Sequence, residues 1–209
     1  MPDTIPPPLS IRHDLSLIAD LIDSGARVLD VGCGDGALLE HLERTKDVDG
    51  RGIELSMDGV RNCVARGLSV IQGDADTDLK DYPSASFDYV VLSQTLQAMR
   101  DPKAVLGNLV RIGRRAIVSL PNFGHWRVRT ALLLHGRMPK TDSLPHAWWA
   151  TPNIHVCTIA DFVDLTRDMG VRIDRSMILS RGGRQTAAQG MGPLANWFGE
   201  QGIFLLSQR

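Results

Sequence analysis

The chain has few cysteines, almost no net charge and no long apolar run. Its three cysteines, Cys33, Cys63 and Cys157, stand far apart and form no C-x-x-C pair, which argues against a disulfide framework or a thiolate metal site and suits a reducing cytoplasm. The net charge of −1 exerts no long-range attraction on nucleic acid or on an anionic membrane. No stretch approaches the roughly 18 consecutive apolar residues that a membrane-spanning helix needs. We therefore expect a small molecule or another protein as partner, with no nucleic acid and no membrane.

The amino terminus lacks the cationic start and the apolar stretch of a secretory signal peptide. Residues 1–8 contain four prolines instead. We expect these residues to form a flexible leader that is frayed from the domain, with a backbone that the prolines make locally stiff. The chain is 43% hydrophobic and 22% charged, which is ordinary for a globular domain with a buried core. We therefore expect a single cytoplasmic domain over residues 9–209.

Short apolar segments alternate with amphipathic ones through the first 120 residues. The expected strands are residues 27–31, 51–54, 68–72, 87–92 and 115–120, and the expected helices are residues 9–24, 37–45, 57–66 and 103–112. Strands that alternate with helices pair in parallel through right-handed crossovers. The order therefore predicts an α/β fold, with a doubly wound, mostly parallel sheet covered on both faces.

The remainder of the chain departs from this alternation. About residues 121–157 are rich in Trp, His, Arg and Pro, and they predict an inserted lid. A helix at residues 159–169 and strands at residues 172–179 and 202–206 follow. Between those strands, residues 181–192 hold four glycines and predict a mobile loop.

A glycine-rich turn follows the first expected strand, with Gly32, Gly34 and Gly36 leading into the next helix. In a doubly wound sheet, ligands bind beyond the carboxyl ends of the strands. Glycines at such a turn let backbone N–H groups approach a ligand that a Cβ would obstruct. The spacing is ambiguous, because Gly32, Gly34 and Ala37 also fit the dinucleotide pattern G-x-G-x-x-G/A.

The charged residues beside the glycines indicate which kind of ligand fits this turn. Asp30 and Asp35 flank the glycines, and carboxylates there would repel the diphosphate of a dinucleotide at the helix N-terminus. S-adenosylmethionine (SAM) carries a sulfonium and an ammonium group instead, which carboxylates favour, and Asp30 would face its methionyl end. Glu54 ends the second strand, where it can accept both ribose hydroxyls, and Asp74 follows the third, where it can accept from the adenine amino group.

The sequence thus predicts a site for SAM or S-adenosylhomocysteine, and an NAD-linked oxidoreductase is the disfavoured alternative. Ser93 and Gln94, after the fourth strand, are expected to line the far wall. The predicted cofactor-binding residues are Asp30, Gly32, Cys33, Gly34, Gly36, Glu54, Leu55, Asp74, Ala75, Ser93 and Gln94.

Together these features, over about residues 27–120, resemble the class I SAM-dependent methyltransferase family. The resemblance implies a Rossmann-like, seven-stranded sheet in the order 3-2-1-4-5-7-6. Its last strand, residues 202–206, would run antiparallel to the others.

A narrower resemblance covers about residues 11–207. The segments that carry it are Arg-His-Asp-Leu at 12–15, Ser-Gln-Thr-Leu-Gln at 93–97, Pro-Asn-Phe-Gly-His-Trp-Arg-Val-Arg at 121–129, Gly-Arg-Met-Pro at 136–139, Thr-Pro-Asn-Ile-His at 151–155 and Asp-Phe at 161–162. They resemble the methionine biosynthesis protein MetW family. The family's usual Trp-Tyr-Asp-Thr-Pro-Asn is Trp-Trp-Ala-Thr-Pro-Asn here, so Ala150 replaces an aspartate and any chemical role of that carboxylate is absent. The resemblance implies a role in methionine biosynthesis as partner or activator of homoserine O-acyltransferase.

The alternative function is a SAM-dependent methyltransferase acting on an unidentified small molecule. Methyl transfer from a sulfonium is an in-line displacement, so alignment supplies most of the rate and a base is needed only for a protonated nucleophile. The weak catalytic candidates are Asn122, His125 and His155, with Asn153 as an orienting amide. The histidines lack the i, i+4 spacing of a zinc site, and we expect no metal.

Three tryptophans, Trp126, Trp148 and Trp149, fall within the expected lid. We expect them to form a small core of that lid. The alternative is an exposed anchor for a partner beside Arg127 and Arg129, because Trp and Arg dominate protein interfaces.

Overall fold

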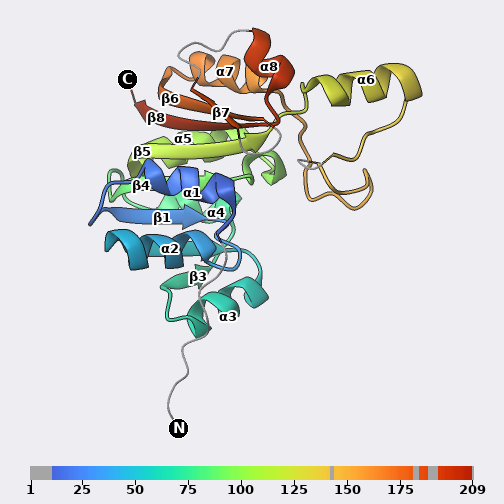
Figure 1. Ribbon diagram of the computed structural model, residues 1–209. Helices are drawn as coiled ribbons and strands as arrows, with labels where there is room; N and C mark the ends of the chain where they lie inside the picture. The colour runs from blue at the N-terminus through green and yellow to red at the C-terminus, as the bar shows by residue number, and fades with distance from the viewer. Residues whose placement is uncertain (1–10, 142–143, 181–183, 188–192, 209) are drawn as a thin grey trace.

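The computed structural model describes residues 11–141, 144–180, 184–187 and 193–208 (Figure 1). The predicted leader at residues 1–8 lies outside these ranges. The strands are β1 (Arg27–Val31), β2 (Asp49–Glu54), β3 (Val70–Gln72), β4 (Phe87–Ser93), β5 (Gly113–Pro121), β6 (Val171–Ser180), β7 (Arg184–Ala187) and β8 (Gln201–Gln208). The helices are α1 (His13–Asp20), α2 (Ala37–Lys46), α3 (Met57–Ala65), α4 (Ala75–Asp78), α5 (Pro102–Ile112), α6 (Trp126–His135), α7 (Ile159–Asp168) and α8 (Pro193–Phe198), with 3-10 turns η1 (Leu79–Asp81) and η2 (Leu96–Ala98).

The strands form one sheet in the order β3-β2-β1-β4-β5-β8-β6-β7. The first five are parallel, and β8 runs antiparallel between β5 and β6. This confirms the predicted fold class and the predicted order of the seven expected strands.

The short edge strand β7 adds to the prediction. It pairs antiparallel with β6, inside the glycine-containing segment that was expected to be a mobile loop. Arg-Gln-Thr-Ala has little intrinsic strand preference. Its pairing satisfies backbone groups along the open edge of β6, which a local sequence pattern does not reveal.

Helix α1 ends earlier than expected, at Asp20. The amide N–H groups of Leu21 and Ile22 donate to the carbonyls three residues earlier, and the ammonium of Lys46 donates to the carbonyls of Ala19 and Ile22 at 2.7 Å each. The two bonds from Lys46 satisfy carbonyls at the end of the helix from a distant part of the chain. Gly25, the expected helix end, lies instead in the turn before β1 with a φ of 71°.

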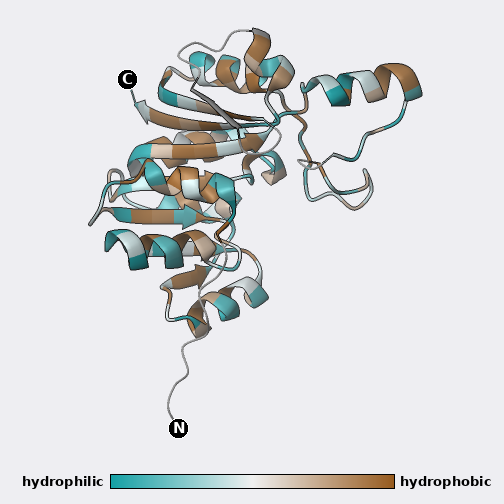
Figure 2. Ribbon diagram, viewed as in Figure 1, coloured by the Kyte–Doolittle hydropathy of each residue, from teal (hydrophilic) through white to brown (hydrophobic). Residues whose placement is uncertain are grey.

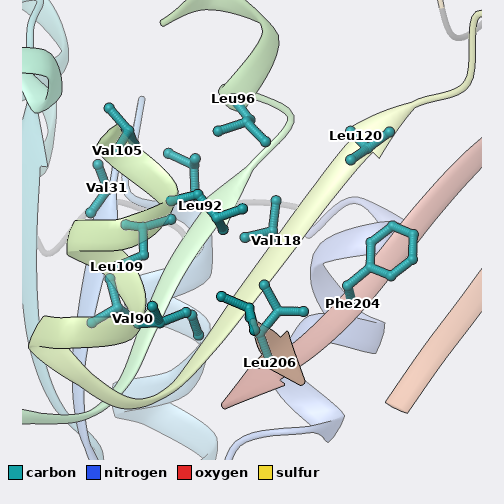
Figure 3. Packing of buried hydrophobic residues seen from close by; sticks show 14 of the residues in the cluster. Val31, Val90, Leu92, Leu96, Val105, Leu109, Val118, Leu120, Phe204 and Leu206 are labelled. Carbon is teal, nitrogen blue, oxygen red and sulfur yellow. The ribbon is translucent and has the colours of Figure 1, made fainter. Parts of the chain in front are cut away.

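Apolar residues fill both faces of the sheet. Along β4, Val90 and Leu92 belong to the cluster beneath α5 and α7, whereas Tyr89 and Val91 belong to the cluster beneath α1 and α2. Figure 3 shows the first cluster, in which α5 packs across β4, β5 and β8. Each fully buried Val or Leu contributes about 1.5–3 kcal/mol relative to exposure. This core holds the carboxyl ends of the parallel strands in fixed register.

Helix α6 and the segment after it project from the carboxyl edge of the sheet (Figure 1). The sequence predicted an insertion at this place but no helix within it. Within the described ranges, no helix combines the length and apolar character needed to cross a membrane.

Candidate functional site

The carboxyl ends of four parallel strands bring the predicted cofactor residues to one edge of the sheet. Asp30 of β1 is level with Gly52 of β2 on one side and with Val91 of β4 on the other. Glu54, two residues beyond Gly52, is level with Gln72 of β3. The turns that follow these strands therefore lie side by side.

The glycine-rich turn depends on backbone conformations that other residues rarely adopt. Gly32, Gly34 and Gly36 have φ angles of 71°, 59° and 81°. A Cβ at Gly36 would overlap the side chain of Leu68 and lie 2.9 Å from the sulfur of Cys63, whereas a Cβ at Gly34 would meet nothing within 4 Å. Gly36 thus lets α3 pack under the turn, and the space beside the Cα of Gly34 is open, where a ligand can approach.

Glu54 connects the turn to the end of β2. Its Oε2 accepts from the N–H of Gly34 and its Oε1 from the N–H of Ser56, each at 2.9 Å. Each carboxylate oxygen has a further lone pair, so Glu54 can accept two ribose hydroxyls while it holds the turn. The neighbouring Leu55 is 65% exposed and offers an apolar surface beside it.

Asp74 begins the short helix α4. Its Oδ1 accepts from the N–H of Asp76 at 2.9 Å, and its Oδ2 accepts from the guanidinium of Arg100 at 3.2 Å. Ala75 packs against the main core. The carboxylate therefore already has a capping role, and one further acceptor position on each oxygen is left for an amino group.

Asp30 is a buried acidic residue. Its side chain is 3% exposed, and among the described residues no hydrogen bond or ion pair reaches its carboxylate. Burial, and secondarily the negative charge of Glu54, raise the pKa of Asp30 to about 7, against the opposing effect of Arg12. An unpaired buried carboxyl is costly when ionised, and a cationic ligand group would compensate that cost.

The far wall is built from polar groups after β4 and β5. The hydroxyls of Ser93 and Ser119 are 3.2 Å apart, and Gln94, with a φ of 52°, donates its N–H to the carbonyl of Ser119 at 2.9 Å. Gln97 Nε2 donates to the carbonyl of Gln94 at 2.6 Å, while its buried Oε1 has no partner among the residues that the structure describes.

Sequence reasoning missed two parts of this wall, Asp14 and Gln97. The Asp14 carboxylate accepts from Gln94 Nε2 at 2.8 Å and from Gln201 Nε2 at 3.3 Å. The available signal was the pair of motifs at residues 12–15 and 93–97, which marked the family without assigning a role to any side chain.

Cys33 contributes backbone rather than reactive sulfur to the turn. Its thiol and that of Cys63 are free and buried, and burial raises the pKa of both. They pack with Leu39, Leu68 and Val70 in a small apolar cluster. Thiols in such surroundings are unreactive.

Asn122 is fully buried and all its hydrogen-bonding capacity is used. Its Nδ2 donates to the carbonyls of Asn196 and Gly199 at 2.9 and 2.7 Å. Its Oδ1 accepts from the N–H groups of Gly124 and Ile159 at 2.9 and 3.2 Å. The amide ties the end of β5 to the start of α7 and to α8, so a chemical role would require breaking these bonds.

The two histidine candidates lie in different environments. His125 is 5% exposed and begins α6, where its Nδ1 accepts from the N–H of Arg127 at 3.4 Å. The pKa of His125 is lowered, mainly by burial. The negative charge of Glu200 raises this pKa and partly opposes the effect of burial, whereas the positive charge of Arg127 lowers it slightly further. His155 is exposed, and its backbone N–H donates to the carbonyl of Gln97 at 2.9 Å. Nowhere in the described part of the chain do three His, Cys, Asp or Glu side chains gather as metal ligands do.

The tryptophans do not form the expected lid core. Trp148 and Trp149 are 70% and 74% exposed and contact each other edge to face, with ring centroids 5.7 Å apart. Trp126 is 38% exposed, with the guanidinium of Arg127 over its ring at 5.5 Å. The core prediction was wrong because the segment extends away from the sheet and finds little to pack against (Figure 1).

More apolar surface lies on the same projection. The outer end of α6, brown in Figure 2, carries Leu133 and Leu134 at 83% and 74% exposure. An open pocket of about 60 Å³ lies in the following segment. Its lining includes Phe123, Met138, Leu144, Trp148, Asn153 and Val156. We refer to the described residues 126–141 and 144–156 as the arm.

Comparison with known proteins places these features in a family. The model described as methionine biosynthesis protein MetW matches residues 12–206. A bifunctional methionine biosynthesis protein MetXA/MetW from Rhodopirellula baltica is 34% identical over 182 residues, which cover 83% of this chain and 29% of that protein. The chain thus spans less than a third of the length of that relative.

Solved structures share the fold. A SAM-dependent methyltransferase from Thermotoga maritima superposes with a TM-score of 0.67 at 18% identity, covering 94% of this chain and 88% of that one. A second, from Archaeoglobus fulgidus, gives a TM-score of 0.65 at 14% identity, covering 93% and 91%. At these identities the likeness is one of fold, which is that of the class I methyltransferases.

Proposed function

This chain belongs to the methionine biosynthesis protein MetW family, and we propose that it binds SAM or S-adenosylhomocysteine and acts in methionine biosynthesis as partner or activator of homoserine O-acyltransferase. The observation that carries the binding proposal is the buried Asp30, which has no partner among the described residues, beside a turn that is open at the Cα of Gly34. Fold alone does not establish activity, so each half of the proposal needs its own support.

The residues at the strand ends fit SAM in shape and charge. Asp30 would neutralise the ammonium group, Glu54 would accept the ribose hydroxyls, and Asp74 would accept from the adenine amino group. When bound, SAM supplies a methyl group on a cationic sulfonium. Carboxylates suit a cationic ligand and disfavour a diphosphate.

The arm supports the partner half of the proposal. Exposed apolar patches rimmed by polar residues mark interaction sites in soluble proteins, and Trp and Arg are enriched at the centres of interfaces. A relative whose name joins MetXA and MetW on one chain is consistent with two proteins that work side by side. We place the contact with the acyltransferase on Trp148 and Trp149.

A double substitution tests that contact. Trp148→Ala with Trp149→Ala should abolish co-purification with homoserine O-acyltransferase, because two large exposed rings are removed from the proposed centre. Val64→Ala with Ile71→Ala is the matched control, since those side chains are 57% and 58% exposed on α3 and β3, at the opposite edge of the sheet. A folded tryptophan variant that still associates with the enzyme would refute the contact.

The same proposal gives SAM a regulatory role. SAM is the downstream product of methionine synthesis, so its binding to this protein would change the activity of homoserine O-acyltransferase in the complex. Such regulation requires the ligand to bind the free protein and the complex with different affinities. Measuring partner affinity with and without SAM tests this, and equal affinities would remove the regulatory role.

The open pocket favours one alternative, a methyltransferase acting on a small molecule. Its lining is mostly apolar, with Asn153 and Thr151 among the polar groups, as in many small-molecule sites. The alternative predicts release of S-adenosylhomocysteine with a defined acceptor in the absence of the acyltransferase. Turnover that requires the acyltransferase would count against it.

A further inference from the structure

The arm carries a positive charge that the net charge of the whole chain does not reveal. Residues 126–156 hold four basic residues, Arg127, Arg129, Arg137 and Lys140, and one acidic residue. The whole chain holds 23 Lys and Arg against 24 Asp and Glu, which leaves 19 against 23 outside this segment. The formal charge is therefore +3 in the segment and −4 in the remainder of the chain.

None of these four side chains forms an ion pair within the described ranges, where the pairs involve other arginines. The guanidinium carbons of Arg127 and Arg129 lie over tryptophan rings instead, 5.5 and 4.8 Å from the ring centroids. Arg137 and Lys140 are exposed. The arm thus presents positive charge that no described acidic side chain neutralises.

Apolar side chains lie between these charges. Leu133 and Leu134, near the end of α6, are 83% and 74% exposed. Arg127 and Arg129 precede them on the same helix, and Arg137 follows its C-cap residue. Arg127 and Leu134 are seven residues apart, close to two helical turns, so they lie on the same side of α6. The arm therefore has an apolar surface with cations on both sides of it.

This distribution favours a protein over a membrane as the occupant. A helix that lies in an anionic membrane surface keeps its basic residues on one face and its apolar residues on the opposite one. In α6 the two kinds of residue are not segregated in this way. The remainder of the chain, at −4, would also be repelled by such a surface. An apolar centre with a polar rim is typical of protein interfaces.

The matching surface has to be acidic around an apolar centre, because a cation that loses its water without gaining an anion is costly. We propose that the arm docks on a surface of this chemistry on homoserine O-acyltransferase, with Leu133 and Leu134 as apolar contacts and with Arg137 and Lys140 facing carboxylates. Two arms of the same charge repel each other, which disfavours arm-to-arm docking of a second copy of this chain. The inference rests on the proposed function, and it adds the charge of the partner surface and the end of α6 to the contact.

Charge reversal at two salt concentrations tests the acidic rim. In surface plasmon resonance at about 0.01 M salt, Arg137→Glu with Lys140→Glu should slow association with purified homoserine O-acyltransferase about 10- to 100-fold, because the substitutions turn electrostatic attraction into repulsion. At about 1 M salt the Debye length falls from about 30 Å to about 3 Å. The wild-type association rate should fall there, and the two proteins should then agree within about threefold.

A matched control changes the net charge by the same amount elsewhere. Arg44→Glu with Arg61→Glu alters side chains of 57% and 71% exposure on α2 and α3. It should slow association by no more than about threefold, because only charges close to the contact are strongly coupled to it. Circular dichroism establishes that each variant is folded.

A third variant tests the apolar centre. Leu133→Ser with Leu134→Ser should leave the association rate within about twofold and raise the dissociation rate about 10-fold or more, because the loss of buried contacts acts mainly on dissociation. An unchanged dissociation rate would remove the end of α6 from the contact.

The outcomes are distinct. An Arg137→Glu, Lys140→Glu variant that associates as fast as the control, or a wild-type rate that does not depend on salt, would overturn the acidic rim while leaving the tryptophan contact intact. Wild-type protein that does not associate with the acyltransferase at either salt concentration would overturn the proposed partnership, and this inference with it. A wild-type dimer that the charge reversal disperses in analytical ultracentrifugation, or salt-sensitive binding to phosphatidylserine vesicles, would identify another occupant and overturn the inference. Slower association of the charge-reversed variant at low salt alone supports it.

Discussion

Replacing Asp30 by asparagine should stabilise the ligand-free protein at neutral and alkaline pH. The substitution keeps the shape of the side chain and removes a buried charge that has no partner in the described part of the chain. The pKa of Asp30 is about 7 in the folded protein, against an ordinary value of 3.8. At ~1.4 kcal/mol for each pH unit, this difference makes the ionised carboxyl cost about 4 kcal/mol of folding free energy.

The sign follows from the raised pKa. The folded protein holds the Asp30 proton more tightly than the unfolded chain does, so stability from this group is complete below pH ~4 and is lost as the pH rises to about 7. The advantage of Asp30→Asn over wild type should therefore grow by about 3 kcal/mol between pH 5 and pH 8.

Urea denaturation followed by circular dichroism at several pH values measures this difference. Asp58→Asn is the matched control, because the Asp58 side chain is 86% exposed, and it should change stability by no more than about 0.5 kcal/mol. An Asp30→Asn variant that is no more stable than wild type at pH 8, or whose advantage does not change with pH, would refute the reasoning. The same variant should bind S-adenosylhomocysteine more weakly and lose the rise in affinity expected for wild type between pH 6 and pH 8.

Other substitutions separate the roles of neighbouring residues. Gly36→Ala should cost more than about 2 kcal/mol of unfolding free energy, because its Cβ would meet Leu68 and Cys63. Gly34→Ala should cost about 1–2 kcal/mol because of its positive φ, but it should weaken the binding of S-adenosylhomocysteine more than Gly36→Ala does in calorimetry. Equal losses of affinity in the two variants would contradict the orientation of the turn. Asn122→Ala should cost about 2–4 kcal/mol in urea denaturation, because three buried partners and one half-buried partner lose their bonds; a change below about 0.5 kcal/mol would show that the amide is dispensable. Cys63 should react with a maleimide at the rate of unfolding, and rapid labelling of the native protein would contradict its burial.

The parallel core could be predicted because its signals are local. β1 was predicted with its observed bounds, since Val28, Leu29 and Val31 are apolar and Gly32 ends the strand. The gathering of the proposed cofactor residues follows from the same logic, because they lie at or just after the ends of parallel strands, which meet at one edge of the sheet.

Features that depend on distant contacts could not be predicted. Asp14 meets Gln94 and Gln201, which are 80 and 187 residues away, and no local pattern indicates that pairing. Asn122 was predicted from the sequence only as a weak catalytic candidate, but its four hydrogen bonds involve elements as far as residue 199. The tryptophans of the arm failed as a core prediction because hydrophobicity alone does not tell which side chains are covered.

The most direct test of the central claim is the binding of SAM, S-adenosylhomocysteine and NAD to the wild-type protein by isothermal titration calorimetry. One site for SAM and S-adenosylhomocysteine, with no heat from NAD, is the predicted result. A ligand at 100 times its dissociation constant should also stabilise the fold by about 2.7 kcal/mol. Tight binding of NAD, or no binding of either adenosyl compound, would contradict the assignment of Asp30 and Glu54 to a cationic, phosphate-free ligand.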